Sequence, residues 1–126
     1  MHALVLHGSP DAPDARVDTF DAPPVPEGGV RVAVSHSSLN YKDGLAVTGA
    51  GKIIRGAFPF VPGIDAAGTV VESDATEWGT GDAVVLTGWG TGETQWGGFA
   101  DTADARPEHL VRVPDGWTPE RAMAFG

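Results

Sequence analysis

Short runs of alternating apolar residues, each closed by glycine, proline or aspartate, restrict the fold of this chain more than any other feature. In the stretch GGVRVAVSHSSLN, Val30, Val32 and Val34 alternate with Arg31 and Ala33. This period is typical of a half-buried β-strand. The 18 glycines and 10 prolines among 126 residues are many for a helical protein but normal for short strands joined by turns. The sequence therefore predicts a mainly β structure.

The glycine, proline and aspartate residues between the apolar runs also set the bounds of the expected strands and helices. The predicted strands are residues 2–7, 16–20, 30–39, 66–73, 81–88, 97–105 and 109–116, with turn-rich loops at 10–15 and 21–29. Only two segments read as helices: residues 40–47, with Asn40 as a possible N-cap, and a segment from 118, with Thr118 as the cap and Pro119 at its first position. These elements predict one domain, a mostly antiparallel β-barrel that carries function on its loops.

Charge and cysteine content exclude several classes of function. The chain has 8 Lys and Arg against 17 Asp and Glu, a formal net charge of −9. Nucleic acids and anionic membranes are bound mainly through basic clusters, so neither is an expected partner. The absence of cysteine excludes disulfides and thiolate metal sites. With no basic leader and no apolar run of about 20 residues, we expect a soluble cytoplasmic protein.

One carboxylate stands out. Asp65 lies in the apolar stretch FVPGIDAAGTV, where a charge is costly unless it is paired or used. Either a functional role uses this charge, or Asp65 is half of a buried ion pair with Arg55 or Lys52.

The glycine-rich segments do not match nucleotide-binding motifs. The stretch GWGTGETQWGG at 88–98 has Glu93 where a dinucleotide fingerprint needs its third glycine. We expect it to be a loop whose Trp89 and Trp96 pack over the barrel mouth. The stretch TGAGKI at 48–53 lacks the first glycine and the final Ser or Thr of a P-loop.

Four stretches together resemble a known family: SSLNYKDGLAVTG (37–49), PFVPGIDAAGTVVES (59–73), GDAVVLTGWGTGETQWGGFAD (81–101) and LVRVPDGWTPERAMAFG (110–126). They are similar to the N-terminal GroES-like domain of medium-chain dehydrogenases/reductases, in the zinc-independent branch of quinone oxidoreductases and acrylyl-CoA reductases. The resemblance implies a GroES-like, partly open antiparallel β-barrel with one or two short helices. Residues 1–126 would then be a catalytic-domain fragment. A Rossmann domain downstream would hold most of the NADPH and form a homodimer.

The resemblance also bears on zinc. Zinc-bearing relatives carry Gly-His-Glu where this chain has Gly63, Ile64 and Asp65, and a cysteine near Asn40. Isoleucine cannot coordinate a metal, and a catalytic zinc needs three converging protein ligands. The histidines show no metal-ligand spacing: they are His2, His7, His36 and His109. We therefore expect no zinc.

Without a Lewis acid, hydrogen-bond donors must stabilise the negative charge that hydride transfer leaves on the acceptor. This favours an α,β-unsaturated carbonyl or thioester, such as an acrylyl-CoA-like compound, or a quinone. The resemblance thus implies NADPH-dependent reduction of a small molecule, with the isolated fragment inactive. The alternative is a stand-alone GroES-like binding or chaperonin-like module without enzymatic activity.

The resemblance places candidate site residues around the first helix. Asn40 would donate its amide to substrate or cofactor, or serve only as the N-cap. Tyr41 would be a proton relay or oxyanion donor, or a packing residue. Lys42 would reach a cofactor phosphate or a carboxylate, or remain solvated. Asp43 is expected to be a local hydrogen-bond partner. Asp65 would orient Asn40, Lys42 or a ribose hydroxyl, or act as a general acid.

Overall fold

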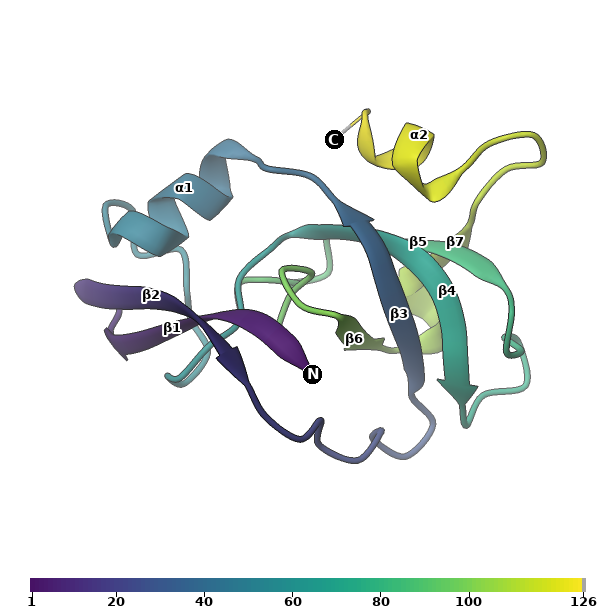
Figure 1. The fold of residues 1–126 in the computed structure, drawn as a ribbon, viewed down its shortest axis with the longest axis horizontal. Coiled ribbons are helices and arrows are strands. Elements are labelled where there is room, and N and C mark those ends of the chain that lie inside the picture. Colours follow the sequence, from purple (N-terminus) through teal and green to yellow (C-terminus); the bar gives the residue numbers. More distant parts are fainter. Residues whose placement is uncertain (126) are drawn as a thin grey trace.

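The computed structural model describes residues 1–125 and consists of two antiparallel sheets with short helices at one side (Figure 1). A two-stranded sheet pairs β1 with β2, and a five-stranded sheet has the order β6-β3-β4-β5-β7. The strands are β1 (His2–Ser9), β2 (Ala12–Thr19), β3 (Val30–Ser37), β4 (Asp65–Ser73), β5 (Ala83–Thr87), β6 (Thr102–Ala105) and β7 (Leu110–Arg112).

The two sheets are joined by isolated bridges and not by a continuous strand ladder. Ala3 bridges to Ala100, and Leu6 bridges to Phe60, whose carbonyl accepts the Leu6 N–H at 2.7 Å. The sheets curve toward each other without closing, so the prediction of a partly open antiparallel barrel is confirmed. Apolar side chains form three buried clusters, one on the five-stranded sheet and two that include residues of β1. Their largest fully buried members are Leu6, Val30, Val32, Phe60, Val61, Val70 and Val84.

Both predicted helices are present. Helix α1 spans Tyr41–Thr48, follows the N-cap Asn40 and ends at Gly49, whose left-handed φ of 75° suits glycine. Helix α2 spans Pro119–Met123, and the Thr118 hydroxyl oxygen accepts the Arg121 backbone N–H at 3.2 Å. A short 3₁₀ turn at Pro107–His109 precedes β7. Among the described residues, no helix is long and apolar enough to cross a membrane.

Three expectations about strands were wrong in part. The loop expected at 10–15 is mostly strand, because Ser9 pairs with Ala12 across a tight turn and the pairing continues to Thr19. Pro13 is tolerated there because β2 lies at a sheet edge. The strand expected at 97–105 is regular only from Thr102, since residues 97–101 cross over to meet the other sheet. The strand expected at 109–116 is reduced to β7.

Candidate functional site

Asp65 begins β4 and lies opposite Thr87, the last residue of β5. Its side chain is buried, with the residue 7% exposed. One carboxylate oxygen accepts a hydrogen bond from Asn40 Nδ2 at 2.8 Å, and the other accepts the Thr87 hydroxyl. The buried charge is therefore met by an amide and a hydroxyl, both neutral.

The ion pair that the sequence left open for Asp65 is not formed. Lys52 Nζ lies 3.8 Å from Asp11 on the far end of the hairpin, and Arg55 is exposed. Within residues 1–125, the Asp65 carboxylate has no salt bridge. The expected orienting contact is present, because Asp65 holds the Asn40 amide.

Asp43 is the second buried carboxylate, at 1% exposure. Its Oδ2 accepts the backbone N–H of Asn40 at 2.8 Å, which is one half of a capping box at the start of α1. Its Oδ1 accepts the backbone N–H of Ile64 at 3.0 Å. Asp43 is a local hydrogen-bond partner as expected. It also ties α1 to the residue before Asp65, which fixes the two sides of the site relative to each other.

Asn40 has the N-cap role that the sequence left open, and its donation to substrate or cofactor stays a prediction. It is the N-cap of α1, and its side-chain amide also donates to Asp65 across the site. These contacts hold the amide in one orientation, since Nδ2 must face the carboxylate.

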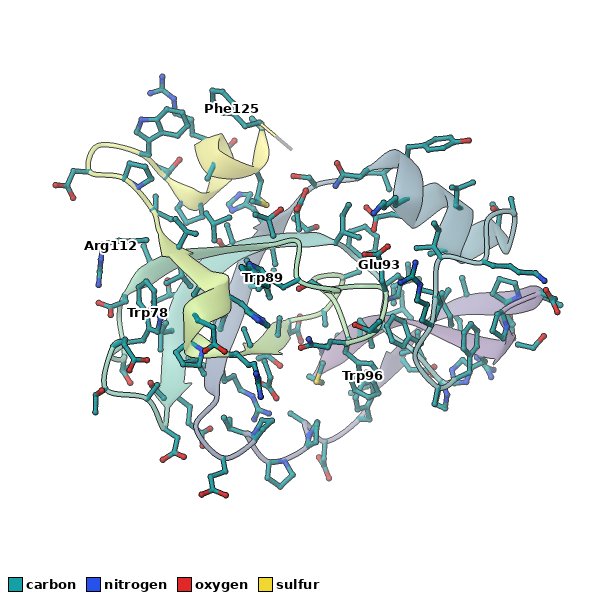
Figure 2. All side chains as sticks on the ribbon, turned by 180° about the vertical axis from the view of Figure 1, so that it is seen from behind. Trp78, Trp89, Glu93, Trp96, Arg112 and Phe125 are labelled. Carbon is teal, nitrogen blue, oxygen red and sulfur yellow. The ribbon has the colours of Figure 1, made fainter. Side chains whose placement is uncertain are left out.

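The next two residues face outward. Tyr41 is 83% exposed, so its phenol does not pack in the core. Lys42 Nζ lies 3.3 Å from Glu93 Oε1, an ion pair that links α1 to the glycine-rich loop; Glu93 is labelled in Figure 2. A shallow hollow runs along this face of the helix, lined by Leu39, Asn40, Tyr41, Gly44, Leu45 and Thr48.

The glycine-rich loop packs backbone against backbone. The Gly97 N–H donates to the Val61 carbonyl at 2.7 Å, and the Gly98 N–H donates to the Gly63 carbonyl at 2.8 Å. Gly63 has a φ of 106°, and a Cβ there would lie 2.6 Å from the Phe99 nitrogen. The glycines therefore bring the loop onto the segment leading to Asp65. Because the N–H groups of Gly97 and Gly98 are already used, they do not form a phosphate cradle.

The two tryptophans of this loop, Trp89 and Trp96, contact different aromatic partners. Trp89 stacks on His109 with ring centroids 4.6 Å apart, and Trp96 meets Phe20 edge to face at 5.6 Å. Both are visible in Figure 2.

The site residue that sequence reasoning missed is Thr87. Its hydroxyl is the second donor to Asp65, and only the β4–β5 register brings the two together. Across the described part of the chain, no three His, Asp or Glu side chains converge as metal ligands.

The alcohol dehydrogenase GroES-like domain family matches residues 26–115. The chain is 49% identical, over all 126 residues, to a probable acrylyl-CoA reductase, AcuI, of Escherichia coli (strain K12). It is 36% identical, again over 126 residues, to a putative quinone oxidoreductase, YhfP, of Bacillus subtilis (strain 168).

Among solved structures, the yhdH oxidoreductase from Salmonella enterica in complex with NADP superposes on the whole chain with a TM-score of 0.93 at 47% identity. This chain covers 39% of that protein, 39% of the Escherichia coli relative and 38% of the Bacillus subtilis relative. It thus spans about two fifths of the proteins it matches.

Proposed function

This chain belongs to the alcohol dehydrogenase GroES-like domain family, and we propose that it is the catalytic-domain part of a zinc-independent, NADPH-dependent reductase. The acceptor is an α,β-unsaturated thioester or carbonyl, of the acrylyl-CoA type, or a quinone. The names of the similar proteins support this choice, since they are a probable acrylyl-CoA reductase, a putative quinone oxidoreductase and an oxidoreductase in complex with NADP.

The observation that carries the proposal is the buried contact between Asn40 and Asp65. An amide held at 2.8 Å by a carboxylate is fixed before any ligand arrives. Asp65 uses one of the two Nδ2 hydrogens, which leaves the other hydrogen to meet an oxygen of the substrate or of the cofactor carboxamide. Preorganised neutral donors of this kind stabilise negative charge that develops on an acceptor oxygen.

The residues at the start of α1 fit the nicotinamide end of the cofactor, and the glycine-rich loop does not offer a phosphate cradle. The Gly97 and Gly98 N–H groups donate to the Val61 and Gly63 carbonyls and are not free to bind a pyrophosphate. Asn40 and the exposed Tyr41 offer an amide and a phenol at the start of α1. Bound NADPH would supply the hydride, and a following Rossmann domain would hold the rest of the cofactor.

The other assignments follow from position. The Tyr41 phenol, open to solvent, holds the proton that the reduced acceptor takes up. Asp65 acts as a positioning residue through Asn40, and Thr87 holds Asp65 in turn. The donor set does not fit zinc, because Ile64 has no ligand atom and both Asp65 oxygens already accept hydrogen bonds.

The experiment uses the full-length protein with NADPH and a panel of acrylyl-CoA, crotonyl-CoA and quinones. In Asp65→Asn an amide group faces the donors of Asn40 and Thr87, so orientation is lost; in Tyr41→Phe the phenol is lost. We expect each change to lower kcat/KM by about tenfold or more, which is at least about 1.4 kcal/mol of transition-state stabilisation. Asp115→Asn, an exposed carboxylate, is the control and is expected to have unchanged activity.

Unchanged kcat and KM in both site variants would remove Asp65 and Tyr41 from the mechanism. Stoichiometric zinc in the purified protein, with activity lost on chelation, would contradict the metal-free assignment.

A further inference from the structure

Trp89 combines an unusual backbone with an unusual exposure. It has a φ of 59° and lies between Gly88 at 72° and Gly90 at 79°, so three consecutive residues are left-handed. A bulky non-glycine residue is rare in this region, and such conformations gather where ligands bind. Trp89 is also 62% exposed. The chain therefore holds a large apolar ring in solvent at a conformational cost.

Neighbouring residues hold both the Trp89 ring and its backbone in place. His109 stacks on it at 4.6 Å with the two planes 9° apart, and Gln95 Nε2 donates to the Trp89 carbonyl at 3.3 Å. The Thr94 N–H donates to the Gly90 carbonyl at 2.8 Å, which holds the turn that follows. One face of the indole is covered by His109, and its exposure leaves the opposite face to solvent. Figure 2 shows Trp89 beside β7, on the side toward Glu93.

The stacked pair of Trp89 and His109 lies two strands away from Asp65 of the candidate site. β5 runs between β4 and β7, with Asp65 opposite Thr87 and Leu110 opposite Leu86. His109 directly precedes β7. Adjacent strands lie about 4.8 Å apart, so the backbones of Asp65 and His109 are separated by about 10 Å across β5. The stacked pair of Trp89 and His109 therefore lies at the same end of the five-stranded sheet as Asp65, two strands away.

The groups around Trp89 determine which part of an acceptor can stack on its ring. Trp89 has imidazole, amide and glycine neighbours, and the chain carries a net charge of −9. The phosphates of a coenzyme A or a dinucleotide would meet no cation in these contacts. A neutral, conjugated group offers a π-face that stacks on indole without desolvating a charge.

We propose that Trp89, supported by His109, is a specificity-determining residue that stacks on the flat, neutral, conjugated part of the acceptor. This inference rests on the proposed function and names the shape that the site selects: planar conjugated carbonyl compounds over saturated ones.

The test measures binding of 1,4-naphthoquinone to the full-length protein by calorimetry, with and without saturating NADP⁺, so that no hydride is available for turnover. In Trp89→Ala we expect the Kd to rise about tenfold, equivalent to about 1.4 kcal/mol. Trp89→Phe keeps a flat ring and should stay within about threefold of wild type by retained stacking. Trp117→Ala removes a tryptophan near α2 and should bind as wild type does, and the NADP⁺ affinity should be unchanged in every variant.

Thermal melts establish that the variants are folded. If Trp89→Ala is not, Trp89→Leu, which is apolar but has no flat ring, takes its place with the same expected rise in Kd of about tenfold. A naphthoquinone Kd in Trp89→Ala equal to that of wild type would overturn the inference. So would equal losses in Trp89→Ala and Trp117→Ala, or no binding to wild type. If wild type binds the quinone through Trp89 but never reduces it or a thioester with NADPH, the proposed function fails, and Trp89 is left as a stacking site for planar ligands without a role in choosing an acceptor.

Discussion

The carboxylates at the site and those at the sheet edges are satisfied by different kinds of partner. The buried Asp43 and Asp65 accept hydrogen bonds only from neutral groups: backbone N–H, amide and hydroxyl. The exposed Asp101 instead pairs with the His2 ring at 2.9 Å, and Asp82 with Arg112 at 3.4 Å. Neutral donors stabilise a buried carboxylate without bringing a second charge out of water. Each lost contact should therefore matter more at the site than at the surface.

The largest expected effect comes from Asp43→Ala. The change leaves the N–H groups of Asn40 and Ile64 without their acceptor at a buried position, and hydrogen bonds to charged groups contribute about 1.5–3 kcal/mol each. We expect the free energy of unfolding to fall by about 3 kcal/mol, measured by urea denaturation. The control Asp11→Ala breaks an exposed pair with Lys52 and should cost less than about 0.5 kcal/mol. Equal losses in the two variants would erase the distinction between site and surface.

Asn40→Asp would sharpen the comparison by placing a second charge in the site. Aspartate is as good an N-cap as asparagine, so the helix start is retained. The new carboxylate would face Asp65 where an amide now donates at 2.8 Å. Two close carboxylates raise the pKa of one of them above its unfolded value.

The raised pKa determines how the stability of the Asn40→Asp variant changes with pH. Repulsion is absent below the unfolded pKa of about 4 and complete above the raised folded pKa, so the variant loses stability as pH rises. At pH 8 we expect it to be about 2 kcal/mol less stable than wild type, with the gap shrinking toward pH 4. Urea titrations at both values measure this. A gap that does not depend on pH would mean that the two side chains do not interact.

A smaller effect is expected from Lys42→Met. The Lys42–Glu93 pair is largely solvated, with the lysine side chain 53% exposed, and such pairs contribute about 0.2–1 kcal/mol. We expect a loss of about 0.5 kcal/mol at low salt that vanishes in about 1 M NaCl. A loss above about 2 kcal/mol would show that this pair behaves like the buried contacts. The cofactor role of Lys42 stays a prediction, which the NADPH Kd of the same variant tests.

Local signals made part of this molecule predictable. Asn40 and Thr118 start helices because their short polar side chains cap helix ends, and the period of Val30, Val32 and Val34 reported a buried strand face. A lone carboxylate in an apolar stretch indicated a charge that must be paired or used, and Asp65 does accept hydrogen bonds from Asn40 and Thr87.

Contacts set by strand register could not be predicted in this way. Thr87 meets Asp65, and Trp89 meets His109, only because β4, β5 and β7 align as they do. Nothing within a few residues of either partner encodes that alignment. Strand β2 is longer than the sequence predicted for a related reason. Pro13 and Asp14 are typical of a loop, but pairing with β1 overrides local propensity at a sheet edge.

The smallest effect is expected at Asp101, on the exposed side of the comparison. The His2 backbone N–H, and then the His2 ring, donate to its carboxylate and hold the pKa of Asp101 below its usual range. A depressed folded pKa gives stability that is present above the unfolded pKa of about 4 and lost as pH falls through the lower folded value. Asp101→Asn should therefore lower Tm slightly at pH 7 and not at pH 2, with Asp115→Asn as the control. A Tm difference that persists unchanged at pH 2 would show that packing, and not the carboxylate charge, joins the two segments.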